Sequence, residues 1–133
     1  MTISVTCNTD RFNLSVVGDD FINACCFGEE FSNSLVAALL AKGVQARVIC
    51  MEDFGWANTA KFGGLSYLML VGGYSHGDTS RPNYGQWGVI LERHRTLIDK
   101  IRGENKMSAS DPFVRKIEQL LKDEGVADVA IEP

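Results

Sequence analysis

The segment whose residue types are best suited to chemistry is the run Glu-Asp-Phe-Gly-Trp in the first half of the chain. The carboxylates of Glu52 and Asp53 stand beside the aromatic rings of Phe54 and Trp56. Apolar neighbours raise the pKa of a carboxyl group, so such a pair could form an acid–base site or a platform for a ligand. The structural alternative is that the rings fill the core, Gly55 permits a bulge or tight bend, and the acids face water.

A second candidate segment is the glycine-rich stretch of residues 72–85, which a long loop would explain. Tyr74 and Arg81 lie within it, and tyrosine, tryptophan and arginine are the residues most enriched at hot spots of protein interfaces. The alternative is that Trp87, just after the loop, belongs to the core and that the tyrosines merely cover loop edges.

The histidines and cysteines predict no metal site and no cofactor. His76 and Asp78 could begin a metal site, but a competent site needs three or four converging ligands and only these two stand out. The cysteines lack the Cys-x-x-Cys spacing of zinc and redox sites, so we interpret all of them as free, buried, structural thiols. They are Cys7, Cys25, Cys26 and Cys50. The glycine pairs also match no phosphate-binding loop that opens a helix.

We predict that function lies on one combined surface built from both segments, with no catalytic residue assigned. Neighbouring acids on an extended chain point to opposite sides, which argues against a catalytic carboxylate pair. The combined surface requires residues 56–62 to form a strand that turns at Gly63-Gly64 and pairs with residues 65–71, so that both segments meet at one end of a sheet. Its members are Glu52, Asp53, Trp56, Tyr74, His76 and Arg81.

Hydrophobic periodicity predicts the remaining elements. Alternation indicates strands at residues 3–7, 12–16, 44–51, 65–71, 86–91 and 126–131, with residues 65–71 in the middle of the sheet because they are apolar on both sides. Three- and four-residue spacing indicates a helix over residues 29–42 that ends at Gly43, and a stripe from Leu91 to Ile101 that ends at Gly103. Asp111 and Pro112 are typical of a helix start.

The predicted fold is α+β: one domain over residues 1–133, with an antiparallel sheet of about four to six strands packed by about three helices. One core is expected to contain Phe31, Leu35, Leu39, Leu68, Leu70, Ile117 and Leu120. The absence of a signal peptide or a long apolar run predicts a cytoplasmic protein without membrane contact.

Charge is unevenly placed along the chain. Residues 1–60 carry seven acidic and three basic side chains, whereas residues 61–133 carry ten of each. The acidic first half argues against nucleic-acid binding, which needs a basic face. Residues 92–116 have a local excess of three positive charges, most simply explained by a solvated helix face.

Several of these segments together resemble a group of small bacterial proteins of unknown function. The resembling segments are Phe-Gly-Glu-Glu-Phe at residues 27–31, the helix that ends at residues 42–44, Glu-Asp-Phe-Gly-Trp at 52–56, and Gln-Trp-Gly-Val at 86–89. That group has a Glu-Asp-Trp-Gly-Trp segment, and this chain has Phe54 in place of the first tryptophan. The resemblance covers roughly residues 20–131 and implies a compact bacterial cytoplasmic domain without a known activity.

Two classes of function remain open from the sequence. The first is a non-catalytic protein-binding module, inhibitory or regulatory in the manner of a toxin-neutralising protein, because acidic inhibitors associate rapidly with basic targets. The second is a small enzyme or small-molecule-binding domain that uses Glu52, Asp53 or His76. The small size and the lack of a catalytic constellation favour the first class, with a protein as the partner. The sequence does not fix the oligomeric state.

Overall fold

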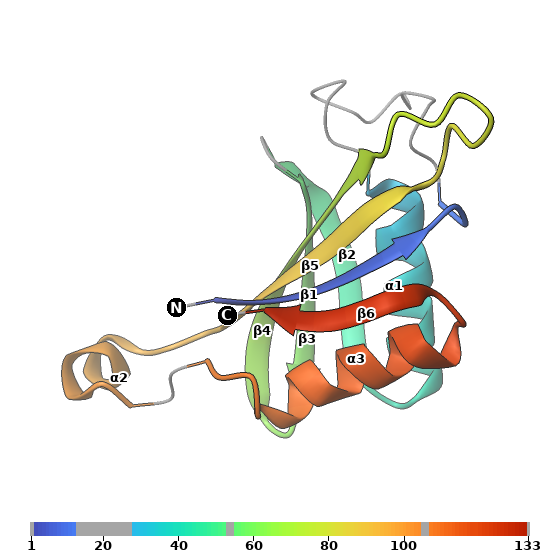
Figure 1. The fold of residues 1–133 in the computed structure, drawn as a ribbon. Helices are drawn as coiled ribbons and strands as arrows, with labels where there is room; N and C mark the ends of the chain where they lie inside the picture. The colour runs from blue at the N-terminus through green and yellow to red at the C-terminus, as the bar shows by residue number, and fades with distance from the viewer. Residues whose placement is uncertain (1, 13–27, 53–54, 105–106, 133) are drawn as a thin grey trace.

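The fold is a six-stranded antiparallel sheet with helices on one face (Figure 1). The computed structural model describes residues 2–12, 28–52, 55–104 and 107–132, and it describes the backbone alone at 50–52. The strand order is β2-β3-β4-β5-β1-β6. The elements are β1 (Ile3–Thr9), α1 (Glu29–Ala41), β2 (Gln45–Glu52), β3 (Gly55–Phe62), β4 (Leu65–Ser75), β5 (Gly85–Arg93), α2 (Leu97–Arg102), α3 (Pro112–Asp123) and β6 (Ala127–Glu132). The predicted α+β class is confirmed.

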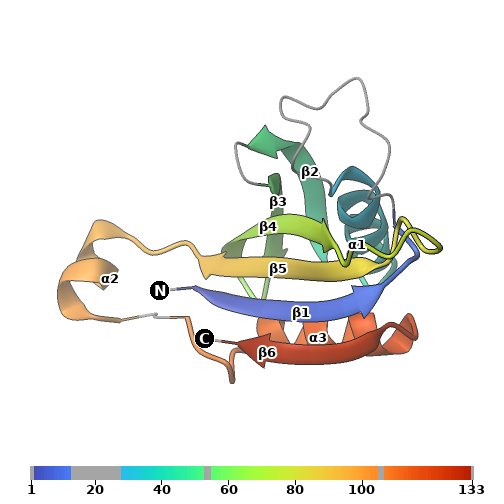
Figure 2. The ribbon, with the colours of Figure 1, turned by 45° about the horizontal axis from the view of Figure 1, so that its top comes forward.

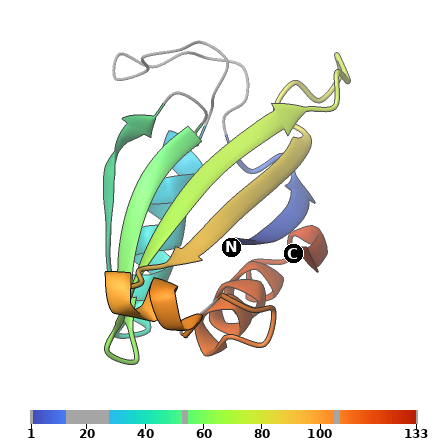
Figure 3. The same ribbon diagram turned by 90° about the vertical axis from the view of Figure 1, so that its left-hand side faces the viewer.

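The core fills the space between the sheet and two of the helices. Helix α1 packs against β2 and β3, and α3 packs against β1 and β6 (Figure 2). Figure 3 shows the same sheet from its other side, which we call the uncovered face, with α1 behind the strands. Side chains at alternate strand positions point into the core, where they meet the apolar stripes of α1 and α3. They include Val5, Met69, Val71, Trp87 and Val89 from the strands, and Phe31, Leu39, Phe113 and Ile117 from the helices.

Capping residues and glycines mark the ends of helices α1 and α3. Helix α1 begins with two glutamates in its first turn, where their negative charges interact favourably with the helix dipole. Gly43 follows the end of the helix with a left-handed φ of 78°. Helix α3 begins at Pro112 after Asp111, whose carboxylate accepts a hydrogen bond from the backbone N–H of Phe113. These predicted boundaries are confirmed within one residue.

The hairpin required by the combined surface is present. Strands β3 and β4 pair from Phe62 and Leu65 at the turn to Trp56 and Val71 at the far end. Gly63 and Gly64 both have positive φ, 60° and 78°, as a two-residue hairpin turn of this hand needs. Strand β4 is central in the sheet, as predicted, but it continues to Ser75, so the connection to β5 is shorter than residues 72–85.

The face of β4 that enters the core was predicted wrongly. Leu68 and Leu70 point to the uncovered face, whereas Tyr67, Met69 and Val71 are buried. A strand that is apolar on both sides gives no alternation to read. Tyr67 determines which face of β4 enters the core, because its hydroxyl group hydrogen-bonds to the buried carboxylate of Asp111, the N-cap of α3. The other expected core residues, in α1 and α3, are buried as predicted.

The predicted helical stripe from Leu91 to Ile101 is also wrong. Leu91 is fully buried in β5, where it pairs with Ile3 and Met69. Helix α2 begins only after Thr96, whose hydroxyl and backbone N–H exchange hydrogen bonds with Asp99 in a capping box. Gly103 ends the helix in a left-handed conformation, as predicted. Its apolar side chains lie in solvent: Leu97, Ile98 and Ile101 are 74%, 60% and 77% exposed.

A buried polar cluster joins three elements around Asp111. Its carboxylate shares the single hydrogen of the Tyr67 hydroxyl group of β4, whose oxygen lies 3.1 and 3.3 Å from the two carboxylate oxygens, and it accepts a hydrogen bond from the Arg93 guanidinium of β5. It also caps α3, so all of its hydrogen-bonding capacity is used while its side chain is fully buried. Burial, followed by the neighbouring Asp111 carboxylate, raises the pKa of Tyr67, which keeps that hydroxyl group a donor.

Both edge strands are irregular. The pairing of β2 with β3 shifts between Val48 and Cys50, which leaves Ile49 as an extra residue. The pairing of β6 with β1 shifts between Thr6 and Asn8. Asp128 lies at this second irregularity with a positive φ of 58°, and its carboxylate accepts a hydrogen bond from Asn8. Such bulges bend and twist a strand locally.

The prediction that the cysteines are free, buried thiols can be compared with the structure at one described side chain. Cys7 is buried in the core and is not in a disulfide. Burial raises the pKa of its thiol to about 11, so it is protonated and unreactive near neutral pH. Cys25 and Cys26 lie outside the described residues, as do the side chain of Cys50, the segment 13–27 with its predicted strand residues, and Phe54.

The register of β4 predicts opposite outcomes for two neighbouring truncations. Met69→Ala removes a fully buried side chain and should lower the free energy of unfolding by about 2–5 kcal/mol. Leu68→Ala, on the uncovered face, should lower it by about 1 kcal/mol or less. Urea unfolding followed by fluorescence measures both. A larger loss for Leu68→Ala would mean that the strand is turned over.

The cluster at Asp111 predicts that removal of this one carboxylate strongly lowers the free energy of unfolding. Asp111→Ala leaves the partly buried Arg93 without its carboxylate partner and removes the cap of α3, so stability should fall by about 3–5 kcal/mol. The matched control is Glu118→Ala, which breaks surface ion pairs within α3 and should cost about 1 kcal/mol or less. Equal losses in thermal and urea unfolding would contradict a special role for the buried cluster.

Candidate functional site

The strand register brings the two predicted segments to the same end of the sheet. The backbone of Glu52 pairs with Gly55 at the end of β2, and Ser75 pairs with Gly85 at the base of the loop between β4 and β5. The hairpin geometry therefore satisfies the condition set for the combined surface. Asp53 and the side chain of Glu52 lie outside the described residues, so their part in that surface stays a prediction.

The loop of residues 76–84 is closed by its own backbone. The N–H of His76 donates to the carbonyl oxygen of Tyr84 at 3.1 Å, and turns within the loop link Asp78 to Arg81 and Arg81 to Tyr84. The Asp78 carboxylate accepts hydrogen bonds from the backbone and hydroxyl groups of Ser80, and the hydroxyl bond is the larger cause of its lowered pKa. Asp78 is thus committed to shaping the turn.

His76 contacts strand β1, and Arg81 contacts Asp10, the residue that follows this strand. The Nε2 atom of His76 lies 2.8 Å from the side-chain oxygen of Asn8, and the guanidinium of Arg81 donates to the Asp10 carboxylate at 2.8 Å. Arg81 also stacks over the Tyr84 ring, 3.9 Å from its centroid. The hydrogen bond from Arg81 lowers the pKa of Asp10, and the same bond raises the pKa of Arg81.

These contacts attach the loop to the neighbouring part of the chain, so the loop does not form an open ligand site. His76 and Arg81 come together around Tyr84, as the combined surface requires, but both already have polar partners, Asn8 in β1 and Asp10 just after it. Tyr74 lies on the uncovered face and is 70% exposed. Trp56 is only 4% exposed, and its ring lies so close to Gly28 that a Cβ there would come within 2.8 Å of it.

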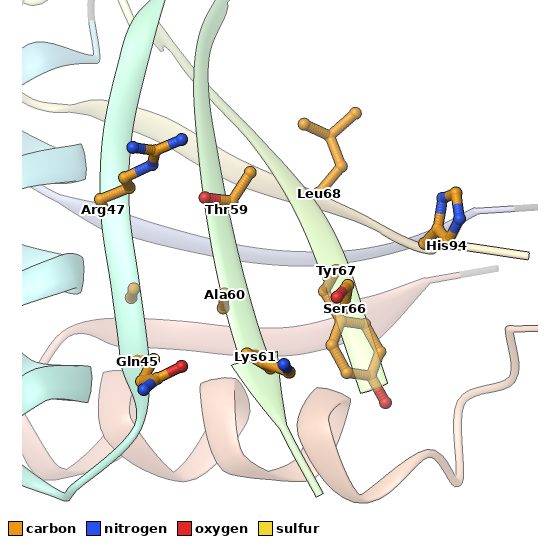
Figure 4. A pocket seen from close by; sticks show the side chains of 10 residues that line it. Gln45, Arg47, Thr59, Ala60, Lys61, Ser66, Tyr67, Leu68 and His94 are labelled. Carbon is orange, nitrogen blue, oxygen red and sulfur yellow. The ribbon is translucent and has the colours of Figure 1, made fainter. Parts of the chain in front are cut away.

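A depression that the sequence did not indicate lies on the uncovered face of β2, β3 and β4 (Figure 4). Its volume is about 610 Å³. Arg47, Thr59 and Leu68 form one row across the three strands, and Gln45, Lys61 and Ser66 form the next. His94, just beyond β5, stands at one side and its backbone N–H donates to the Ser66 carbonyl oxygen at 2.8 Å. Only the strand register, which sequence spacing does not give, could have revealed these rows.

A second unpredicted feature is the arm, residues 95–104, which carries α2 away from the rest of the molecule (Figures 1 and 2). None of the α2 residues is buried. The guanidinium of Arg95 bridges the arm internally, with hydrogen bonds to the carbonyl oxygens of Glu104 at 3.0 Å and Asp99 at 3.2 Å. Polar bonds therefore shape the arm while its apolar side chains face water.

The described residues offer no metal centre. Within these ranges, no group of three or more histidine, cysteine, aspartate or glutamate side chains could hold a metal ion. None of the helices in the same ranges is long and apolar enough to cross a membrane.

Comparisons of the chain with protein-family models, with curated proteins and with solved structures gave no match. The resemblance to bacterial proteins with a Glu-Asp-Trp-Gly-Trp segment therefore stays a prediction.

The contact between Arg81 and Asp10 predicts a measurable titration. In Arg81→Gln the pKa of Asp10 should rise toward the ordinary value of about 3.9, because its charged hydrogen-bond donor is lost. A lowered folded-state pKa means that the pair stabilises the fold above the ordinary pKa, and that this contribution disappears as the pH falls through the folded value. Carbon-detected NMR of the Asp10 carboxyl group measures this change.

Ser80→Ala serves as the control, because it removes a donor to Asp78 and leaves the bond between Arg81 and Asp10 in place. It should raise the pKa of Asp78 and leave the titration of Asp10 unchanged. An Asp10 titration that is identical in the parent protein and in Arg81→Gln would show that the two side chains do not pair in solution.

Proposed function

We propose that this protein is a non-catalytic protein-binding module, inhibitory or regulatory, that acts in a bacterial cytoplasm. The observation that carries the proposal is the arm, which presents Leu97, Ile98 and Ile101 to solvent on a short helix. Clustered exposed apolar side chains are uncommon on monomeric proteins and mark interaction surfaces.

The arm supports this proposal because its shape does not depend on its apolar side chains. A helix of six residues is marginal in isolation. Here the capping box at Thr96, the bonds from Arg95 and the left-handed Gly103 keep the turn in place. A contact surface that is ordered before binding loses less entropy when a partner arrives. Because the same side chains are mostly exposed, they contribute little to the stability of the free protein.

The positive charges on the arm favour a partner with an acidic surface. Lys100 and Arg102 lie beside the apolar side chains in α2, both exposed. We infer that the partner offers an apolar groove bordered by carboxylates, because rim charges of opposite sign accelerate association. This differs from the expectation that the acidic first half of the chain meets a basic target.

The alternative of a small enzyme or ligand-binding domain that uses Glu52, Asp53 or His76 has less support. His76 is bonded to Asn8 and packs beside Tyr84, so its imidazole is engaged in the loop. No described acid lies in contact with it that would orient it as a general base.

The arm predicts loss of binding in a double variant. Ile98→Gln combined with Ile101→Gln should weaken the complex by at least about a hundredfold, since it removes two apolar anchors and leaves the fold unchanged. The partner is first captured from native lysate with the parent protein, then purified and titrated by calorimetry. Leu40→Gln is the control, because Leu40 is 55% exposed on α1 and should leave affinity unchanged.

Two results would contradict the proposal. One is a partner that binds the double variant as tightly as it binds the parent protein. The other is light scattering that shows the arm joining two copies of this chain, with the dimer lost in the double variant and no second protein bound. Circular dichroism and urea unfolding of all variants separate lost binding from lost folding.

A further inference from the structure

Two positive side chains, those of Arg47 and Lys61, lie on the uncovered face, and neither forms an ion pair among the described residues. The acid Glu92 lies on the same face, but it is on β5, beyond Leu68 in the row of Arg47. Arg47 pairs with Thr59, and Gln45 pairs with Lys61, so Arg47 and Lys61 are diagonal neighbours on adjacent strands. Diagonal neighbours are about 7–8 Å apart, within reach of long side chains, and like charges in such positions repel each other. Figure 4 shows both side chains on the same face of the sheet.

The lining of the depression contains no acid. Its side chains are those of Gln45, Arg47, Thr59, Lys61, Ser66, Leu68 and His94, with Ala46, Ala60 and Tyr67 beneath them. Within the described part of the chain, neither Arg47 nor Lys61 forms an ion pair. Two positive side chains therefore face a hollow whose lining residues include no acid, in a protein whose net charge is −4.

These charges specify the chemistry of a ligand. A phosphate monoester carries about −1.5 to −2 charges at pH 7, which matches two basic side chains, whereas a single carboxylate supplies one. The guanidinium of Arg47 can donate two parallel hydrogen bonds to phosphate oxygens, and Lys61 adds a mobile ammonium group. The hydroxyl groups of Thr59 and Ser66 lie in the adjoining rows as further donors.

The size of the hollow indicates a ligand larger than phosphate itself. A volume of about 610 Å³ lies in the range of small-molecule sites. Leu68 lies in the row of Arg47 and Thr59 and points to the uncovered face, where it offers an apolar contact for a carbon skeleton. His94 stands at the side of the hollow and can donate a further hydrogen bond.

We propose that this depression binds the phosphate group of a small phosphate monoester, held by Arg47 and Lys61, with its organic part against Leu68. The site shares no residue with the arm, so it stands or falls separately from the protein-binding function. It also differs from the loop at residues 76–84, whose Arg81 is already neutralised by Asp10.

Phenyl phosphate is a suitable probe, because it joins a phosphate dianion to an apolar ring. Its dissociation constant is measured by calorimetry for the parent protein and for Arg47→Gln combined with Lys61→Gln. Both side chains are exposed, so the fold should be unaffected. Loss of two charge-assisted contacts should weaken binding by at least about tenfold. Backbone NMR shifts should localise the probe to Thr59, Ser66 and Leu68.

The matched control is Lys42→Gln combined with Arg115→Gln, which removes the same two residue types outside the depression. Its affinity for phenyl phosphate should stay within about twofold of the parent protein, because screened distant charges contribute little. Benzoate, which has the same ring and a single carboxylate, should bind at least about tenfold more weakly than phenyl phosphate.

Each alternative outcome overturns the proposal. Equal weakening in the two double variants would mean that general charge attraction explains the binding. Equal affinity for benzoate and phenyl phosphate would remove the assignment to phosphate. Absence of binding at millimolar phenyl phosphate, or shifts confined to residues outside the depression, would show that the hollow is only a solvated part of the sheet.

Discussion

The fold depends most on one buried carboxylate. Asp111 receives hydrogen bonds from β4 and β5 and from the first turn of α3, and so fixes the helix against the middle of the sheet. A buried charge is tolerated only when its hydrogen-bonding capacity is used, and such a network selects one arrangement of its partners. The Tyr67 hydroxyl group can reach Asp111 only if β4 presents its odd-numbered residues to the core. The facing of the central strand is thereby determined, and with it the composition of the uncovered face.

The same cluster explains how the arm can project without loosening the core. The chain leaves β5 just after Arg93, and it returns to the core at Met107 shortly before Asp111. Because Arg93 and Asp111 form an ion pair, both ends of the excursion are fastened by side chains that do not belong to it. The two ends of the arm are therefore held in place when α2 contacts another molecule. The arm has its own polar bonds, and the core below it is complete without its apolar residues.

Much of the fold could be predicted from local sequence, because several boundaries have chemical markers. Asp111-Pro112, Gly43 and Gly63-Gly64 each indicate a start, an end or a turn through φ preferences and capping. Leu91 and the α2 residues were misplaced because apolar spacing there fits a helix, whereas the capping box of Thr96 and Asp99 starts the helix later. The marker is present in the sequence as the pair Thr96 and Asp99. Leu68 and Leu70 could not be assigned, since both sides of β4 are apolar.

The candidate sites could be predicted only in part, for a similar reason. Residues 76–84 form a loop beside β1, but the bond between Arg81 and Asp10 joins positions 71 residues apart in sequence. Arg47 and Lys61 become neighbours only through the pairing of β2 with β3, including the shift at Ile49. Sequence spacing indicates which residues share a face of one element, and it does not indicate the register between elements.

The irregular edges restrict how another protein can approach this sheet. An exposed edge strand offers unpaired backbone groups to which a foreign strand could add. Here β2 contains the extra residue Ile49 and β6 is bent at Asp128, whose carboxylate projects at the bulge. Each break interrupts the straight ladder that strand addition needs. Extension of the sheet from either side is thereby disfavoured, both for a visiting peptide and for fibre-like stacking of copies, and recognition is left to side chains.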